Sequence, residues 1–418
     1  MSKVIKWIKS GGAISLMDQA VSSLGNFLTA MMLAKSLTPS DFGVYTLINT
    51  TMLVTNGLAA ALVIMPLRVL GVGLAGKRLD LYVSHRIIFQ FIITSLLAAA
   101  GIAFLYVEYT HDNSLLLTYI VYSILGQLQE FGRACNASHF KWMTLFVSDI
   151  LSVTTRVALL AAMVWGGALD VVSAILICSL GYAVGSLIGS TGKARFILEF
   201  KNVRKSWFEN WRFGKWLMFE SAVYTVSTQV YFYLIASWVD IESAGAFGAA
   251  QVLLNMLNVV MLGLVNYAVP VARKRLLENG QAAWKQWWRL IGSVIFIINF
   301  TACILISIFA VRLLSMLFQP TFSQYAYIVP ILACAMVLTS LTTVMSAALR
   351  TAELPQAGFA AKLISAVLTL VIAHPLIMSL NVAGAAIGMI VTQLCWLLVY
   401  VYSLKERVGP RQLYSSTS

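Results

Sequence analysis

The sequence predicts an all-α polytopic membrane protein with twelve transmembrane helices in two six-helix lobes that are related by pseudo-two-fold symmetry. Three observations support this prediction: 60% of the 418 residues are hydrophobic, only 11% are charged, and apolar runs recur along the whole chain. A soluble domain carries about 25% charged residues. The composition therefore excludes a soluble enzyme, a disordered chain and a nucleic-acid-binding protein, although the net charge is +13.

Each of twelve apolar runs is long enough for a helix to cross about 30 Å of hydrocarbon. Because lipid offers the backbone no hydrogen-bond partner, runs of this length are expected to be helical. The first run follows a basic segment, as a signal peptide does, but it contains Asp18, which a signal peptide would not carry. The runs cover residues 11–36, 42–67, 87–107, 115–134, 143–165, 171–191, 216–238, 244–270, 290–311, 326–349, 361–379 and 384–404.

The basic residues predict the orientation in the membrane. If the N-terminus is cytoplasmic, the segments on that side hold 26 of the 29 Lys and Arg residues, and only Lys35, Arg156 and Arg312 remain. An excess of this kind marks the cytoplasmic side of a membrane protein. We therefore expect a multi-pass protein of the bacterial inner membrane with both termini in the cytoplasm. Arg156 is then the one basic residue expected near the middle of the membrane.

Two cytoplasmic segments, residues 201–216 and 271–289, combine basic residues with Trp or Phe. This composition is typical of amphipathic helices at anionic headgroups, and a docking site for a lipid pyrophosphate or a partner is the alternative. We expect an N-lobe at 1–200 with helices 1–6. The C-lobe, at 201–418 with helices 7–12, would be preceded by the first of these segments.

An internal repeat supports the division into two lobes. Adding 202 to each number maps Asp18–Val21 onto Glu220–Val223 without a gap. Since each half would cross the membrane six times, both enter from the same side and are parallel repeats, which are typical of transporters with a binding site between the halves. The same offset pairs Gly12 with Gly214, Ala34 with Ala236, Gly43 with Gly245, Asn56 with Asn258, Leu62 with Leu264 and Val63 with Val265.

Polar residues recur at helical spacing in both halves. Stripes of this kind avoid lipid, so they face a bundle interior or a water-filled cavity. We favour a polar cavity; the alternative is hydrogen bonding between helices, worth about 0.6 kcal/mol on average. The candidate cavity-lining residues are Ser22, Asn26, Thr29, Asn49 and Asn56 in the first half and Tyr224, Thr228, Tyr231, Gln251, Asn255 and Asn258 in the second.

Ionisable residues inside the apolar runs are functional candidates because charges are costly in lipid. Arg156 can bind phosphate or carboxylate oxygens in bidentate fashion. It lies two turns, about 10.5 Å, from Asp149 on the same helix, so direct pairing of the two would be strained. Structural pairing with an acid is the alternative role for Arg156. Asp18, Asp149 and Glu220 are candidates for coupling to a proton or sodium gradient; for Asp18 and Glu220 the alternative is a solvated acid at a cavity mouth.

Motifs of catalysis are missing from the sequence. It contains no GxxxxGK[ST] phosphate loop, no GxSxG nucleophile elbow and no HExxH zinc motif. The five cysteines and four histidines show no metal-ligand spacing. We therefore expect neither a cofactor nor a metal, no nucleic-acid partner, and no enzymatic activity.

One turn carries a family resemblance. Ala34–Pro39 and Asp41–Tyr45 resemble the "ARxLxPxxFGxY" turn between the first two helices of bacterial polysaccharide transporters, which belong to the multidrug/oligosaccharidyl-lipid/polysaccharide (MOP) superfamily. Lys35 replaces the arginine of that pattern and keeps its charge. Residues 346–363 and 381–394 look similar to the family as well, and so does the layout of twelve spans in two lobes.

The resemblance implies a Wzx-type flippase that moves an undecaprenyl-pyrophosphate-linked oligosaccharide across the inner membrane by alternating access. Its partners would be this lipid-linked oligosaccharide, the bilayer and the polymerase and glycosyltransferase machinery of O-antigen, exopolysaccharide or capsule biosynthesis. Such flippases have a cationic cavity, so Arg156 and Lys35 would bind the pyrophosphate.

Two alternatives remain open. A cation-coupled drug or metabolite exporter on the same fold would bind hydrophobic cations and would not need Arg156. A membrane polysaccharide polymerase or ligase would need catalytic residues in a sizeable far-side loop, and the far-side loops here are short.

Overall fold

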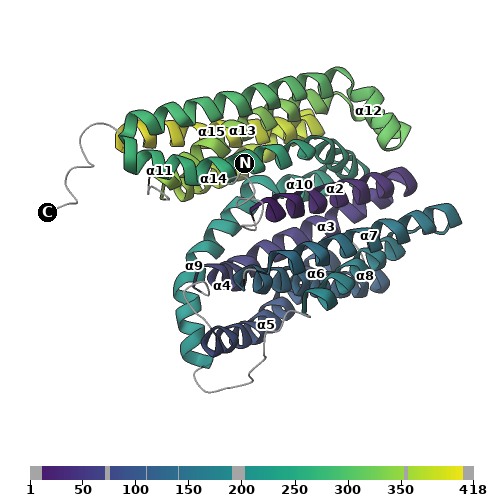
Figure 1. The fold of residues 1–418 in the computed structure, drawn as a ribbon. Coiled ribbons are helices and arrows are strands. Elements are labelled where there is room, and N and C mark those ends of the chain that lie inside the picture. The colour runs from purple at the N-terminus through teal and green to yellow at the C-terminus, as the bar shows by residue number, and fades with distance from the viewer. Residues whose placement is uncertain are drawn as a thin grey trace. The chain divides into compact units, whose positions relative to one another are not determined.

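The computed structural model describes residues 12–70, 76–109, 111–139, 141–190, 203–352 and 356–407, and within these ranges the chain is helical and forms no strand (Figure 1). Contacts divide the chain into two compact units, Met1–Ala222 and Val223–Ser418. The first unit holds α2 (Gly12–Ser36), α3 (Pro39–Ala59), the π-helical turn Ala60–Ile64, α4 (Met65–Leu70), α5 (Lys77–Glu108), α6 (Asn113–Ser138), α7 (Trp142–Gly166), α8 (Val171–Ser190) and most of α9 (Val203–Thr228). The second holds α10 (Val230–Trp238), α11 (Ile241–Ile308), α12 (Ala310–Leu317), the 3-10 helix Pro320–Tyr325, α13 (Ile328–Thr351), α14 (Gln356–Leu380) and α15 (Val382–Arg407).

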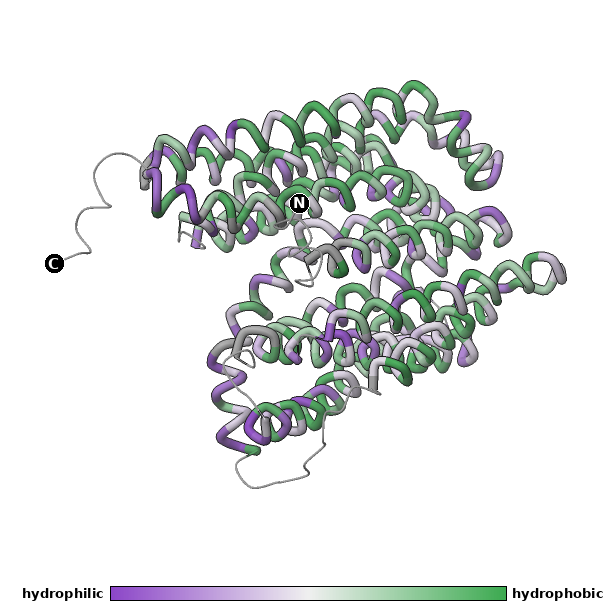
Figure 2. Tube along the Cα trace, in the orientation of Figure 1, coloured by the Kyte–Doolittle hydropathy of each residue, from purple (hydrophilic) through white to green (hydrophobic). Residues whose placement is uncertain are grey.

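Nine helical segments of the described chain are long and apolar enough to cross a membrane. The other three predicted spans coincide with α2, α6 and the pair of α9 and α10. These are helical too, but they are less continuously apolar, and α9 carries hydrophilic residues along its length (Figure 2). The all-α membrane fold is thus confirmed. Both chain ends, whose predicted location is the cytoplasm, lie outside the described residues.

The first half of α9 packs against the first unit. Arg86 donates from its guanidinium to the Ser206 carbonyl oxygen at 3.2 Å, and the rings of Phe89 and Trp207 meet edge to face at 4.9 Å. The Asn210 amide donates to the Leu62 carbonyl oxygen. The amphipathic segment predicted to precede the C-lobe therefore belongs with the first six helices, and the contact boundary falls at 222/223 rather than at 200/201.

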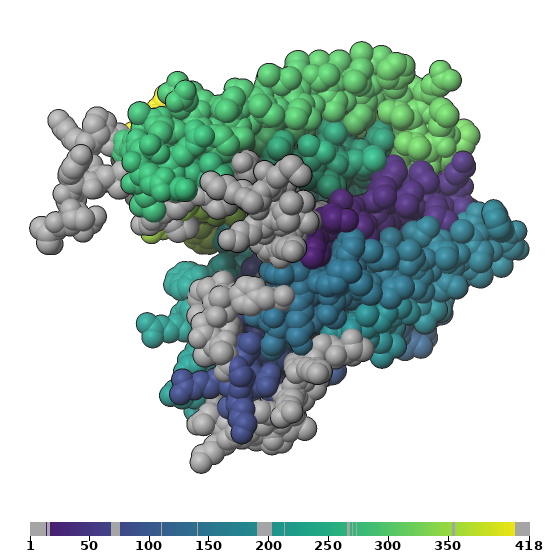
Figure 3. Space-filling view, in the orientation of Figure 1, coloured from purple at the N-terminus to yellow at the C-terminus, as the bar shows by residue number. Residues whose placement is uncertain are grey.

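The second basic segment, residues 271–289, lies inside α11, which continues through a break at Gly280 (φ 76°). Its three tryptophans are buried in the second unit, so they pack against protein where the sequence predicted an exposed amphipathic surface. The Trp284 and Trp288 indoles donate to the Thr351 hydroxyl at 3.0 and 3.3 Å, and Trp287 donates to the Ala268 carbonyl oxygen. Beyond this segment α11 is apolar and exposed, as expected of a lipid-facing helix, and it forms a continuous ridge in Figure 3.

Several helix ends follow the same offset of 202 as the internal repeat. Adding 202 to Ser36, the end of α2, gives Trp238, the end of α10; adding it to Pro39, the start of α3, gives Ile241, the start of α11. The N-caps Thr38 and Asp240 correspond as well, and each side chain accepts a bond from a backbone N–H in the first turn. Later in the chain the offset grows to 214, which maps both ends of α7 onto those of α14. The increase shows that the second half is longer between its second and fifth helices.

Replacing Asp240 by alanine should lower the free energy of unfolding by about 1 kcal/mol, because the Ser243 N–H loses the carboxylate that caps α11 at 2.6 Å. Thermal unfolding of the purified protein in detergent measures the change. Asp240→Asn is the matched control, since asparagine is an equally good N-cap. Equal losses in the two variants would contradict the capping role.

Candidate functional site

The first unit contains a cluster of one arginine and three carboxylates. Arg133 of α6 pairs with Asp18 of α2 at 3.1 Å, with Glu130 one turn earlier at 2.7 Å and with Asp149 of α7 at 2.9 Å. The Asp18 and Asp149 side chains are only 6% and 3% exposed, so the acids lie in a medium that screens charge weakly. One arginine offsets only one of the three negative charges. With every acid ionised, the cluster has a net charge of −2, which suits the uptake of a cation.

Neutral side chains tie Asp149 to the neighbouring helices. The Gln129 amide donates to Asp149 at 3.1 Å, and the Ser22 hydroxyl donates to its other oxygen at 3.3 Å. Ser152 in turn donates to the Gln129 carbonyl oxygen at 3.2 Å. Asp149 is therefore held by α2, α6 and α7 together, and a change in its protonation would be felt by all three helices.

Small residues on α8 allow this network to form. Gly181 and Gly185 are one turn apart and lie directly against α7. A Cβ at Gly181 would meet the Ser152 carbonyl oxygen at 2.9 Å, and one at Gly185 would meet the Gln129 amide nitrogen at 2.7 Å. Close approach of helices at glycine is a common packing solution in membranes. Here it brings Ser152 and Arg156 of α7 against α8.

Arg156 is buried, with 4% of its surface exposed, yet it has no carboxylate within ion-pair distance in the described part of the chain. Its Nη2 donates to the Asn26 side-chain oxygen at 3.0 Å, while its Nε has no hydrogen-bond partner among the described residues. The guanidinium lies 5.7 Å from the ring centre of Tyr182. A positive charge held by neutral groups in this way is suited to an anion.

An aromatic wall stands beside Arg156. The rings of Tyr122 and Tyr182 stack at 5.5 Å, and the Tyr122 hydroxyl donates to Asn49 at 2.9 Å. Arg156, Tyr182 of this wall and the Glu130, Arg133 and Asp149 part of the acidic cluster border one polar cavity of about 90 Å³, enough for about three waters. The polar residues that line it are Ser22, Asn26, Asn56, Gln129, Glu130, Arg133, Asp149, Ser152, Arg156 and Tyr182.

The second unit has a polar cavity of its own, of about 290 Å³. The described residues that line it are uncharged, and five of them are predicted cavity residues: Tyr224, Thr228, Gln251, Asn255 and Asn258. At the offset of 214, Asp149 and Arg156 correspond to Leu363 and Leu370. The charges of the first cavity therefore have no counterparts on α14 of the second unit.

The predicted site residues divide into two groups. Ser22, Asn26 and Asn56 line the charged cavity, and Asn49 contacts its aromatic wall through Tyr122. The other group lies elsewhere. Thr29 is buried and donates to the Gly25 carbonyl oxygen of its own helix, Tyr231 is buried against Gly388, and Lys35 is exposed at the end of α2. Glu220 is half-buried on α9, outside the acidic cluster.

Two basic residues assigned to cytoplasmic segments lie within helices of the first unit instead. α6 extends to Ser138, so Arg133 lies within a helix with 20% of its side chain exposed. α5 begins at Lys77, so Arg86 lies within a helix too, and it is fully buried. The strained pairing of Asp149 with Arg156 does not form, because Arg133 is the partner of Asp149. The spacing of Glu130 and Arg133, three residues apart inside an apolar run, was the signal for this pair.

Comparisons with known proteins agree with this architecture. Residues 8–274 match a family described as polysaccharide biosynthesis protein, and no curated protein sequence matches the chain. An inward-facing multidrug resistance MATE family transporter of the MOP superfamily superposes with a TM-score of 0.70 at 13% identity, over 91% of this chain and 93% of that one. The lipid II flippase MurJ in an inward closed conformation gives 0.70 at 10% identity, over 94% and 87%. A mutant of the Vibrio cholerae MATE transporter VcmN gives 0.61 at 14% identity, over 97% and 98%. At these identities the likeness establishes the fold.

Proposed function

The chain belongs to the polysaccharide biosynthesis protein family and has the fold of MOP superfamily transporters, and from this we propose that it is a Wzx-type flippase. Its substrate would be an undecaprenyl-pyrophosphate-linked oligosaccharide repeat unit for O-antigen, exopolysaccharide or capsule assembly. The flippase carries this lipid across the inner membrane by alternating access. A polymerase and glycosyltransferases would act with it.

The observation that carries this proposal is Arg156, a buried guanidinium held by Asn26 and Tyr182 and by no acid of the described chain. A pyrophosphate would give Arg156 the anionic partner that it lacks among the described residues, and its oxygens match the planar fork of arginine. Lys35 lies nine residues beyond Asn26, the partner of Arg156, which is about 13.5 Å along α2. Lys35 and Arg156 would therefore contact a lipid-linked substrate at different points.

The glycan would bind to neutral polar groups. Asparagine and glutamine side chains present both donors and acceptors, which suits sugar hydroxyls. Both cavities offer such groups, and the second contains no charge among its described lining residues. Since 90 Å³ is too small for a sugar, the cavity of the first unit would widen when the substrate enters.

The acidic cluster would couple transport to an ion gradient. A proton or a sodium ion offsets part of the uncompensated negative charge around Arg133 and changes how Asp149 is held between α2, α6 and α7. Asp18 and Asp149 are the ion-binding candidates, and Glu220 is a separate acid on α9. The same cluster favours the alternative function, a cation-coupled exporter, which would take hydrophobic cations.

A reconstituted flipping assay tests the proposal and separates it from the alternative. Proteoliposomes that contain the purified protein receive a fluorescent polyprenyl-pyrophosphate oligosaccharide in one leaflet, and an impermeant glycosidase reports its movement to the other. We expect movement of this lipid and none of a hydrophobic quaternary ammonium dye. Transport of the dye alone would establish the exporter and refute the flippase.

Neutralising the coupling candidates should remove the dependence on the gradient. In Asp149→Asn and Asp18→Asn proteins, an imposed proton or sodium gradient should accelerate flipping less than twofold, because the cluster loses an ionisable oxygen. Asp41→Asn is the control, since this exposed acid binds Thr38 at the start of α3, away from the cluster. Full gradient dependence in both cluster variants would disprove coupling through these acids.

A further inference from the structure

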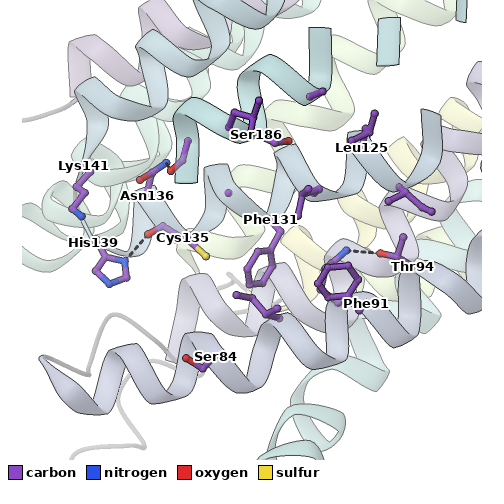
Figure 4. A pocket seen from close by; sticks show the side chains of 18 residues that line it. Ser84, Phe91, Thr94, Leu125, Phe131, Cys135, Asn136, His139, Lys141 and Ser186 are labelled. Atoms are coloured by element: carbon purple, nitrogen blue, oxygen red, sulfur yellow. Dashed lines mark hydrogen bonds between the residues drawn. The ribbon is translucent and has the colours of Figure 1, made fainter. Parts of the chain in front are cut away.

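A groove of about 600 Å³ lies between α5, α6 and α8 of the first unit (Figure 4). Its walls are largely apolar, and Phe91, Leu128 and Leu187 leave 56%, 38% and 69% of their surfaces exposed along it. His139 and Lys141 lie at one end of the groove and Thr94 at the other. The groove is thus an open apolar channel with basic side chains at one end.

The basic end is fixed by the chain around it. His139 donates from Nδ1 to the Cys135 carbonyl oxygen at 2.8 Å, and its Nε2 lies 3.7 Å from an oxygen of the Asp80 carboxylate. The Lys141 N–H donates to the Asn136 carbonyl oxygen at 2.8 Å, while its half-buried side chain makes no ion pair with a described residue. An anion at this end would meet the Lys141 ammonium group, while the nearby Asp80 carboxylate lies beside His139.

The second unit has a groove of the same kind. It measures about 660 Å³ and lies between the later half of α11, α13 and α15. Lys285 and Arg289 stand at one end, exposed and without an ion pair to a described residue. Trp284 and Trp288 form part of its wall, and their indole bonds to Thr351 hold this wall in position.

The two grooves occupy equivalent positions in the repeat. The helices around them, α5, α6 and α8, correspond in order to the later half of α11, α13 and α15. In both units the basic residues lie at the helix ends whose charge predicts the cytoplasmic side. An apolar groove with basic residues at one end thus recurs in both halves. A ligand that binds both grooves must reach both halves in the same way, as the surrounding lipid does.

The lengths of the grooves indicate a lipid of one leaflet. From Lys285 to Ile297 the second groove follows α11 for about 18 Å, and from Ser84 to Thr94 the first follows α5 for about 15 Å. Half of a hydrocarbon core of about 30 Å is the depth of a single leaflet. An acyl chain fills an apolar groove of this depth while its phosphate reaches the basic end.

The groove of the first unit is separate from the charged cavity. Gly126, Gln129 and Arg133 of α6 border the cavity, whereas Leu128 and Gly132 face the groove from another side of the same helix. A lipid in the groove would therefore not occupy the site around Arg156.

From this geometry we propose that each unit binds an anionic glycerophospholipid of the cytoplasmic leaflet, with an acyl chain in the groove. The phosphate lies at Lys141 in the first unit and at Lys285 and Arg289 in the second. The bound lipids would fix the packing of the third, fourth and sixth helices of each unit. This proposal concerns the bilayer and is independent of which substrate is transported.

Two pairs of variants test it. Lys141→Gln and the double variant Lys285→Gln/Arg289→Gln remove charge, while Gly132→Leu and Gly292→Leu fill the grooves. A Cβ at Gly132 meets nothing within 4 Å and one at Gly292 meets Val344 at 3.5 Å, so these leucines extend into open space. Native mass spectrometry of the full chain in detergent measures binding of dioleoyl phosphatidylglycerol, with phosphatidylcholine as the neutral comparison.

We expect two tightly bound phosphatidylglycerols per chain and much weaker binding of phosphatidylcholine. Each leucine should remove one site. Each basic residue lost should weaken phosphatidylglycerol binding a little more than fivefold. Lys141→Gln should therefore weaken binding at the first groove about fivefold, and the double variant should weaken binding at the second groove about 30-fold. Arg312→Gln, which removes an exposed charge on α12 outside both grooves, should bind as the unaltered protein does.

Three results would overturn the proposal. Unchanged phosphatidylglycerol binding in both leucine variants would show that the grooves are not the sites. Equal binding of the two phospholipids would refute the role of the basic ends. Displacement of phosphatidylglycerol by a polyprenyl phosphate at a tenth of its concentration would assign the grooves to a prenyl lipid.

Discussion

Arg156→Ala should reduce flipping of a pyrophosphate-linked oligosaccharide about 100-fold, because a buried charge-assisted bond to phosphate contributes about 2–3 kcal/mol to binding. Arg156 already lies in a polar cavity with Asn26 as its hydrogen-bond partner and without a carboxylate in the described chain. Its loss leaves no other unpaired cation among the described residues of that cavity, since Arg133 is held by three acids. Initial rates in the proteoliposome assay measure the effect.

Arg156→Lys is the matched variant. Lysine keeps the charge but not the planar fork, so we expect an activity between those of the unaltered protein and the alanine variant. Asn26→Ala keeps the Arg156 guanidinium but removes the hydrogen bond that positions it. This variant should raise the substrate concentration needed for half-maximal flipping more than it lowers the maximal rate. Normal flipping by Arg156→Ala would show that the pyrophosphate binds elsewhere.

The second large effect concerns Arg133. Arg133→Ala should destabilise the protein by about 3–5 kcal/mol, because it leaves Asp18 and Asp149 buried without their cation. The expected signature is a much lower unfolding temperature in detergent. Arg133→Ala should fold best at low pH, where the carboxyl groups bind protons.

Double variants separate this mechanism from simple loss of packing. Adding Asp149→Asn to Arg133→Ala removes one unpaired charge and should restore at least about 1 kcal/mol of the loss. Adding Asp41→Asn, which lies outside the cluster, should restore nothing. If the two double variants are equally unstable, Arg133 acts through its volume and not through its charge.

Much of the fold could be predicted because hydrocarbon imposes a simple rule on sequence. A segment that crosses the hydrocarbon core must be helical and about 20 residues long, so apolar runs of this length predict the membrane spans directly. The repeat could be found for the same reason: uncommon residues such as Asp18 and Glu220 stand out in apolar sequence, and the helix ends at Ser36 and Trp238 follow the same offset.

Helix boundaries were the weaker part of the prediction. Arg86 and Arg133 lie near the ends of apolar runs, where sequence does not distinguish a loop from a further helical turn. Trp284 and Trp288 have the composition of an interfacial segment, yet their indoles find a partner in Thr351, 67 and 63 residues away. Amphipathic residues suit both settings, and only the neighbouring helix decides between them.

The sequence by itself determined that this protein is a membrane-embedded, repeated helical bundle with a few charges at depth. Only the tertiary structure decided how those charges pair. Arg133 reaches Asp18 across 115 residues and Arg156 reaches Asn26 across 130. These pairings depend on how closely helices pack, as at Gly181 and Gly185, and helical periodicity specifies a face but not the helix opposite it. For that reason Arg133, and not Arg156, pairs with Asp149, and Arg156 has no carboxylate partner in the described chain.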